Sequence, residues 1–235
     1  MLHKQPPAAL AAQAATTTIP IVFEIGSDPI RLGLVASLNR PGGNATGVTN
    51  LIVEVAPKRL ELLHELLPTA RTMALLVNPA DRALAQAQSR EVLSASRALG
   101  LELHILNAST ERDFDAVFAN LIRLRARGLV IGAGSIFVRW VEQLAALTVR
   151  HAVPAIYQAR EFPAAGGLMS YGSDVTDSYR LAGIYTGRVL NGDNTADLPV
   201  QNATKFELYI NLKTAKALGI TVPLPLLGRA DVVIE

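Results

Sequence analysis

The sequence predicts an α/β fold with parallel sheets, and three observations support that class. Short β-branched segments alternate with longer amphipathic segments from residue 19 to about residue 190. Strand-helix units of this length are typical of parallel strands joined by crossover helices. Of the 235 residues, 50% are hydrophobic and 18% are charged, so the chain can bury a sizeable core. We therefore expect doubly wound sheets with helices on both faces.

The expected elements follow from where the apolar runs begin and end. A first strand covers Ile19–Ile25, and Asp28 and Pro29 are suited to begin a helix that reaches about Leu38. Further strands are expected at Thr46–Thr49, Met73–Val77, Leu101–Leu106, Leu129–Ile131, Pro154–Tyr157, Gly167–Ser170 and Phe206–Ile210. Further helices are expected at Ala8–Ala15, Pro57–Leu67, after Pro79 as far as Leu99, Glu111–Arg125, Ile136–His151, Asp174–Leu190 and Leu212–Leu218.

Composition and motifs argue against several function classes. Lys and Arg (22) barely exceed Asp and Glu (20), and no basic run occurs, so no nucleic-acid partner is expected. The absence of cysteine excludes disulfides, thiolate metal sites and a cysteine nucleophile. The histidines lack metal-ligand spacing, and there is no P-loop or nucleophile elbow. Gly132-Ala133-Gly134 begins like a dinucleotide motif, but the sixth position is Phe137. We expect no catalytic residue, no metal and no cofactor.

Polar residues follow several of the predicted strands. Ligands of doubly wound sheets bind beyond the carboxyl ends of the strands, which makes these loops the candidate site. The candidate binding residues are Ser27, Asp28, Asn78, Ser135, Tyr157, Glu161 and Tyr171. Hydroxyls and helix N-termini suit an anionic group, carboxylates suit a cation, and tyrosine rings suit stacking. The same residue types cap helices, so each loop also has a purely structural explanation.

Several long segments resemble one family. They are Ile19–Pro29, Gly33–Asn44, Pro57–Leu63, Ala165–Gly172 and Asn211–Gly219. In these segments, and over nearly all of residues 8–235, the chain resembles bacterial ABC-transporter substrate-binding proteins of the tryptophan/tyrosine-type family. The resemblance implies a two-lobed type I periplasmic-binding-protein fold that closes on a small ligand. It implies the solute-binding component of an ABC importer, with an amino acid as ligand, aromatic ones first, and a membrane permease as partner.

The resemblance also implies an organisation into lobes. We expect a partial N-terminal lobe at 1–50, a C-terminal lobe at 51–190, and at 191–235 a crossover that returns to the N-terminal lobe. The N-terminal lobe is expected to be incomplete, because family members carry an export signal and roughly three strand-helix units before the helix found here at Ala8–Ala15. The family is periplasmic. Met1–Ala15 lacks an apolar signal core, so the chain as written would be cytoplasmic.

By the same resemblance, Ser27 and Asp28 would lie on the N-terminal side of the cleft. Asp28 would face a ligand ammonium, cap the following helix, or do both. In the second lobe, Ser135 would donate to a carboxylate and Glu161 would pair with an ammonium. Asn78 would line the cleft, and Tyr157 and Tyr171 would pack against the ligand side chain.

Three alternatives stay open at this stage. The same lobes serve as effector domains of bacterial regulators, although Met1–Pro7 is too short for a DNA-binding helix-turn-helix. An enzyme would need a nucleophile-base pair or a cofactor motif, and neither occurs. The chain could also be a non-functional truncated remnant.

Overall fold

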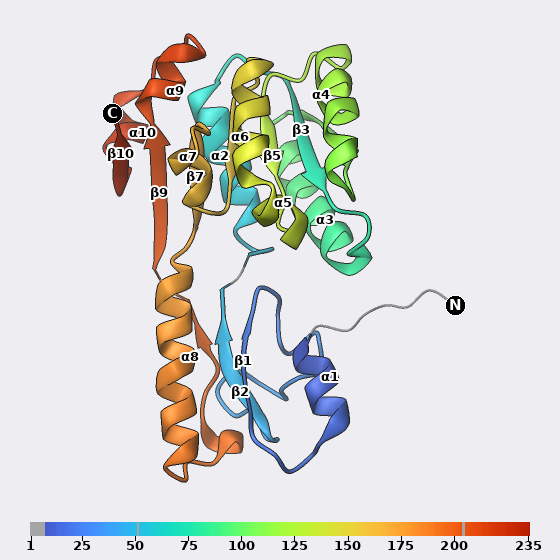
Figure 1. The fold of residues 1–235 in the computed structure, drawn as a ribbon, viewed down its shortest axis with the longest axis vertical. Helices are drawn as coiled ribbons and strands as arrows, with labels where there is room; N and C mark the ends of the chain where they lie inside the picture. The colour runs from blue at the N-terminus through green and yellow to red at the C-terminus, as the bar shows by residue number, and fades with distance from the viewer. Residues whose placement is uncertain (1–7, 51, 204) are drawn as a thin grey trace. The chain divides into compact units, whose positions relative to one another are not determined.

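The computed structural model describes residues 8–50, 52–203 and 205–235, and the chain separates into two compact units (Figure 1). Unit 1 contains the described residues of 1–51 and 173–205, and unit 2 contains residues 52–172 and 206–235. Residues Met1–Pro7, for which neither an export signal nor a DNA-binding motif was expected, lie outside the described residues. The connections between the units fall near residues 51, 172 and 205.

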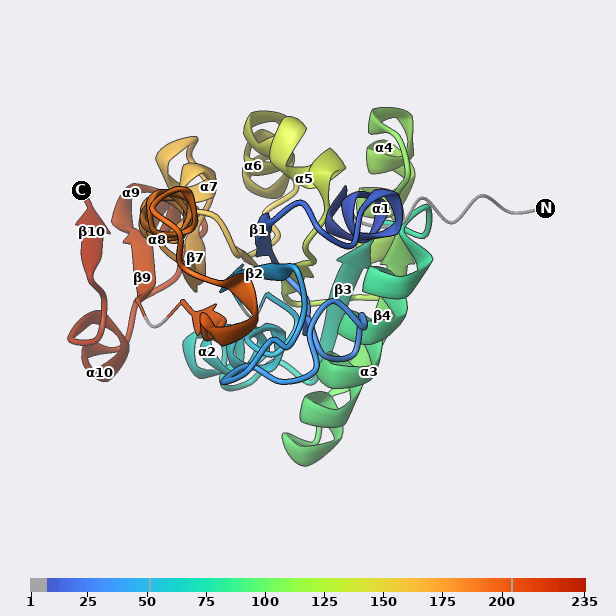
Figure 2. The same ribbon diagram turned by 90° about the horizontal axis from the view of Figure 1, so that it is seen from below.

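Unit 1 is built on a small parallel sheet with strand order β1-β2-β8. Its elements are α1 (Ala8–Ala15), β1 (Ile21–Ile25), β2 (Ala45–Thr49), α8 (Val175–Leu190), the short 3-10 helix η2 (Thr195–Asp197) and β8 (Gln201–Asn202). Helix α8 lies on one side of β1 and β2, and α1 lies on the other (Figures 1 and 2). Gly47 is paired with Phe23, where a Cβ would lie 2.0 Å from the Phe23 carbonyl oxygen, so this register requires glycine.

The segment after β1 differs from the sequence prediction. A helix was expected at Pro29–Leu38, but the chain forms a series of turns there. The Asp28 carboxylate accepts the Ile30 N–H at 2.8 Å and starts one turn, and Gly33, with φ of +74°, ends it in the left-handed region. Leu34 therefore enters the unit 1 core from a loop.

Unit 2 is a doubly wound sheet of seven strands in the order β10-β9-β7-β6-β5-β3-β4. Its strands are β3 (Thr72–Val77), β4 (Glu102–Asn107), β5 (Leu129–Ile131), β6 (Ala155–Tyr157), β7 (Met169–Ser173), β9 (Phe206–Asn211) and β10 (Val232–Ile234). Its helices are α2 (Ala56–Leu66), α3 (Arg82–Ala98), η1 (Glu111–Asp113), α4 (Phe114–Arg123), α5 (Ser135–Arg139), α6 (Val141–Arg150), α7 (Glu161–Ala164), α9 (Leu212–Ala217) and α10 (Leu224–Leu227). Strands β4, β3, β5, β6 and β7 run parallel, as do β9 and β10.

The alternation of side chains along β3 creates two cores. Met73, Leu75 and Val77 face α2 and α3, in a cluster that α9 and α10 join. Ala74 and Leu76 face the opposite way, into a cluster formed with α4 to α7. Helices therefore cover both faces of the sheet, and the doubly wound prediction is confirmed.

The division into units differs from the predicted lobes in two places. The helix at Asp174–Leu190 was expected in the C-terminal lobe, but α8 packs on β1 and β2 of unit 1. The segment 191–235 was expected to return to the N-terminal lobe; residues 191–205 do belong to unit 1, but Phe206–Glu235 adds β9 and β10 to the unit 2 sheet. Hydrophobic spacing locates a helix or strand along the chain without showing which sheet it joins, which explains both differences.

The helix expected at Ile136–His151 is divided at Trp140, which has non-helical dihedral angles between α5 and α6. None of the helices within the described ranges combines the length and the apolar character needed to cross a membrane.

Candidate ligand-binding edges of the two sheets

In unit 2, the predicted site residues follow neighbouring parallel strands and so share one edge of the sheet. Asn78 follows β3, Ser135 follows β5, Tyr157 ends β6, and Tyr171 lies in β7. The loops after β3 and β5 touch, because a Cβ on Gly134 would lie 3.7 Å from the Asn78 Cβ. The Asn78 Oδ1 accepts the Ala80 N–H at 3.0 Å, a local turn. Ser135, at the start of α5, is exposed.

A buried glutamine holds the loop after β5. Gln88, on α3, accepts the Ala133 N–H at 2.5 Å and donates to the Ala133 carbonyl at 3.2 Å. A Cβ on Gly132 would lie 2.6 Å from the Leu76 carbonyl oxygen and 2.9 Å from the Gln88 Oε1. The glycines of this loop therefore serve close packing between β3, β5 and α3.

Tyr157 is placed differently from the expectation that its ring would pack against a ligand. It is fully buried, and its ring meets that of Phe162 edge-on, with centroids 6.0 Å apart. Burial raises the pKa of the Tyr157 hydroxyl. That hydroxyl and the buried Oε1 of Gln158 both lack a hydrogen-bond partner of good geometry among the described residues. Because the ring packs in the core, any contact of Tyr157 with a ligand would be made by its hydroxyl.

The other two predicted residues of this edge are more accessible. Tyr171 is half-buried and stacks on Phe206, with centroids 6.1 Å apart. Glu161 begins α7 and is exposed, with its carboxylate 3.9 Å from the Arg160 Nε. The structure thus brings Asn78, Ser135, Tyr171 and Glu161 to neighbouring strand ends, and their binding roles stay predictions.

Arg59, which the sequence analysis missed, is buried in this unit without a carboxylate. Its side chain, on α2, is 1% exposed and donates to the Ile52 carbonyl at 2.8 Å and the Tyr171 carbonyl at 3.2 Å. Its Nε has no hydrogen-bond partner, and no ion pair reaches it within the described residues. Burial lowers the pKa of Arg59 to about 10, so the guanidinium is charged at neutral pH. Its position four residues before Leu63, on the apolar face of α2, was the available signal.

In unit 1, the predicted residues lie beyond the end of β1. The Asp28 Oδ1 accepts the N–H groups of Ile30 and Arg31 at 2.8 and 3.3 Å. The Asp28 Oδ2 lies 3.5 Å from the Arg31 Nε. The Ser27 carbonyl accepts the Thr49 hydroxyl at 3.3 Å. The Asp28 carboxylate is therefore committed to its own turn, as the capping explanation anticipated.

A second pair at this edge was missed. Asn50, directly after β2, is 5% exposed and donates through Nδ2 to the Glu24 Oε1 at 2.8 Å. The Asn50 Oδ1 is buried without a partner. Burial raises the pKa of Glu24, although the bond from Asn50 opposes that shift. No cation pairs with Glu24 within the described ranges, and the acceptors that the pair offers are the Glu24 carboxylate oxygens and the Asn50 Oδ1.

Comparisons with known proteins decide the family. The profile described as "ABC transporter substrate binding protein" matches residues 5–234. The chain belongs to this family. It is a binding-protein family, so the chain is not an enzyme. Within residues 8–50, 52–203 and 205–235, no cluster of three or more His, Cys, Asp or Glu side chains suits a metal ion.

Two solved structures of the family's fold are closely similar. A conserved domain protein of Vibrio cholerae matches with 26% identity and a TM-score of 0.84, over 97% of this chain and 76% of that one. An ABC domain from Streptococcus pneumonia, solved in complex with L-Trp, matches with the same values. A LacI family transcriptional regulator of Bifidobacterium animalis shares the fold, with a TM-score of 0.64 at 11% identity over 86% of this chain and 71% of that one. The predicted type I periplasmic-binding-protein fold is confirmed.

A curated relative, the tyrosine-binding protein of Clostridioides difficile, is 27% identical over 91% of this substrate-binding-protein chain. The chain spans 61% of the length of that relative.

Proposed function

We propose that this substrate-binding protein captures a free amino acid at the strand ends of its units and delivers it to a membrane permease outside the cytoplasm. The observation that carries the proposal is the Glu24–Asn50 pair. A partly buried carboxylate and a buried, unpartnered amide oxygen lie beside one another, and no cation among the described residues satisfies them. Buried charges in proteins are normally paired, so a cationic group of a ligand is the missing partner.

A primary ammonium fits this pair better than other cations. It carries three donors and no acceptor, and the pair offers carboxylate oxygens and one amide oxygen. Asp28, the residue first expected in this role, already accepts two backbone N–H groups. The ammonium-binding role therefore passes to Glu24, with Glu161 as a further carboxylate on the unit 2 side.

The unit 2 edge suits the opposite end of a zwitterion. Arg59 is charged and has no carboxylate partner within the described residues, so its positive potential is not cancelled locally. The exposed hydroxyl of Ser135 and the buried hydroxyl of Tyr157 supply donors near the same strand ends. A ligand with an ammonium and a carboxylate would thus be attracted by both units, and contacts with both would stabilise a closed state.

The relatives suggest which amino acids to test first. One curated relative is a tyrosine-binding protein and one similar structure holds L-Trp. Tyr171, stacked on Phe206, offers an aromatic surface at the proposed site. We therefore place tyrosine and tryptophan first among the candidate ligands.

Calorimetric titration with L-tyrosine, L-tryptophan and their deaminated analogues tests the proposal. The wild-type chain should bind the amino acid and discriminate against the analogue without the ammonium. Glu24→Gln should weaken amino-acid binding at least about tenfold, roughly 1.4 kcal/mol, and abolish most of that discrimination. Glu111→Gln, the same change at an exposed position of η1, is the matched control. Equal affinities for the wild type and Glu24→Gln would contradict the assignment.

A further inference from the structure

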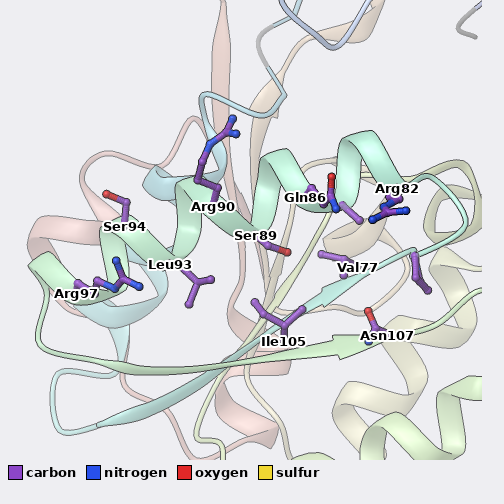
Figure 3. A pocket seen from close by; sticks show the side chains of 12 residues that line it. Val77, Arg82, Gln86, Ser89, Arg90, Leu93, Ser94, Arg97, Ile105 and Asn107 are labelled. Atoms are coloured by element: carbon purple, nitrogen blue, oxygen red, sulfur yellow. The ribbon is translucent and has the colours of Figure 1, made fainter.

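A groove of unit 2 lies between helix α3 and strand β4 (Figure 3). Its volume is about 790 Å³, and none of the predicted binding residues lines it. The floor is apolar: Leu93 of α3 and Ile105 of β4 meet at its middle, and Val77 of β3 lies beside Asn107 toward one end. Leu93 and Ile105 are only half-buried, so an apolar strip is open to an occupant.

Strand β4 is one of the two edge strands of the seven-stranded sheet, and among the described residues it pairs with β3 alone. Its outer row of backbone N–H and C=O groups therefore has no neighbouring strand. Edge strands are commonly protected by charged side chains, but Glu102 of β4, like His104, alternates with Leu103 and Ile105 and so points to the other face. The face of β4 toward the groove therefore carries no charged side chain.

The rim of the groove is cationic. Arg82 and Arg97 stand at its two ends, whereas Arg90 points away from the strand (Figure 3). Arg90 pairs with Glu91, the only acid within α3, at 3.2 Å. Neither Arg82 nor Arg97 takes part in an ion pair within the described part of the chain. An occupant with negative charge at both ends would satisfy them.

The spacing of these arginines sets the size of the occupant. Fifteen helical residues at about 1.5 Å each place Arg82 and Arg97 about 22 Å apart along the α3 axis. An extended chain rises about 3.3 Å per residue, so about seven residues cover this distance. Side chains one, three, five and seven of such a segment share one face. Acidic residues at one and seven would reach the arginines, and apolar residues at three and five would cover Leu93 and Ile105.

We propose that the α3–β4 groove is a docking site for an extended segment of a partner protein, with the pattern acidic-x-apolar-x-apolar-x-acidic. The segment would add to the open edge of β4 as a further strand, a recurring mode of peptide recognition in which backbone hydrogen bonds give affinity and side-chain pockets give specificity. The partner contacts unit 2 alone, so this inference stands independently of the ligand.

Fluorescence anisotropy with the full chain tests the proposal. The probe is a capped, labelled heptapeptide with glutamate at positions one and seven, valine at three and five, and threonine elsewhere. It should bind saturably to the wild type and roughly tenfold more weakly to the Arg82→Glu/Arg97→Glu variant, because two exposed attractions become repulsions. A peptide with lysine at both ends should prefer the variant. Arg112→Glu/Arg150→Glu, two exposed arginines elsewhere in unit 2, is the control with the same net charge change.

Three results would overturn the proposal. The first is no saturable binding to the wild type, or equal binding to the wild type and the charge-reversed variant. The second is undiminished binding of a peptide N-methylated at alternate residues, since it cannot form the strand hydrogen bonds. The third is that something other than a peptide fills the groove. In that case octanoate at the same concentration displaces the peptide, or the chain forms a concentration-dependent dimer in sedimentation that the Arg82→Glu/Arg97→Glu variant no longer forms.

Discussion

Arg59 offers the most quantitative test of how unit 2 is held together. Arg59→Met keeps most of the side-chain volume but removes the donors to the Ile52 and Tyr171 carbonyls. A buried carbonyl left without a donor costs about 1–3 kcal/mol, and these two carbonyls are part-buried, so each loss lies toward the lower end. Part of this loss is offset, because the variant no longer buries an uncompensated guanidinium. We expect a net loss of about 2 kcal/mol, or about 4–8 °C in the melting temperature for a unit of this size.

The pH dependence of this loss follows from the pKa of Arg59, which burial lowers from 12.5 to about 10. The folded state releases the proton before the unfolded state does, so stability linked to Arg59 changes only above about pH 10 and rises there. Between pH 6 and 9 the guanidinium is charged in both states. The difference between the wild type and Arg59→Met should therefore be constant across that range.

Urea unfolding followed by circular dichroism, with hydrogen exchange to report on unit 2, measures the effect. Arg59→Lys should lie between the two proteins, because one ammonium cannot reproduce the fork that reaches both carbonyls. Lys58→Met changes the neighbouring exposed residue and should alter stability by less than about 0.5 kcal/mol. If Arg59→Met is as stable as the wild type, the guanidinium does not stabilise unit 2 and the reasoning fails.

Three further predictions concern other tightly packed or buried groups. Gly172→Ala should destabilise the chain by more than about 2 kcal/mol, because the added Cβ would lie 2.0 Å from the Gln158 carbonyl oxygen; a melting temperature within 1 °C of wild type would contradict this. Gln88→Leu should cost about 2–3 kcal/mol and speed amide exchange at Ala133, whose two backbone bonds it loses; unchanged exchange would contradict the clamp. Burial raises the pKa of Glu24 above 4.5, so as pH rises the unfolded state loses this proton before the folded state does. The stability of the wild type should therefore fall as pH rises just above 4.5, and thermal melts of Glu24→Gln should not show this fall.

Local patterns predicted most of the elements. Strands such as Met73–Val77 and helices such as Asp174–Leu190 were placed to within one or two residues, because burial on one or both faces imposes periodicity on the chain. The helix expected at Pro29–Leu38 failed for a local reason as well. Asp28 was expected to cap this helix and instead starts a turn, which Gly33 ends in the left-handed conformation.

The missed site residues share a physical cause. Glu24 and Arg59 are charged residues inside a strand and on the apolar face of a helix, and their partners, Asn50 and the Tyr171 carbonyl, are distant in sequence. Hydrophobic periodicity does not account for a charged residue within an apolar pattern, and only the tertiary structure shows which groups its side chain contacts. Asp28 shows the converse: its carboxylate was predicted to cap a helix, to bind the ligand, or both, and the structure shows it bound to backbone N–H groups of its own turn.

The measurement that tests the central claim most directly is hydrogen exchange with and without saturating L-tyrosine or L-tryptophan. If the amino acid binds to the strand ends of both units, exchange should slow at residues 24–28 and 49–50 of unit 1 and at 133–135, 157–161 and 171–172 of unit 2. The α3–β4 groove at residues 82–97 should be unaffected. Protection confined to one unit, protection centred on that groove, or no protection by any amino acid would contradict the account.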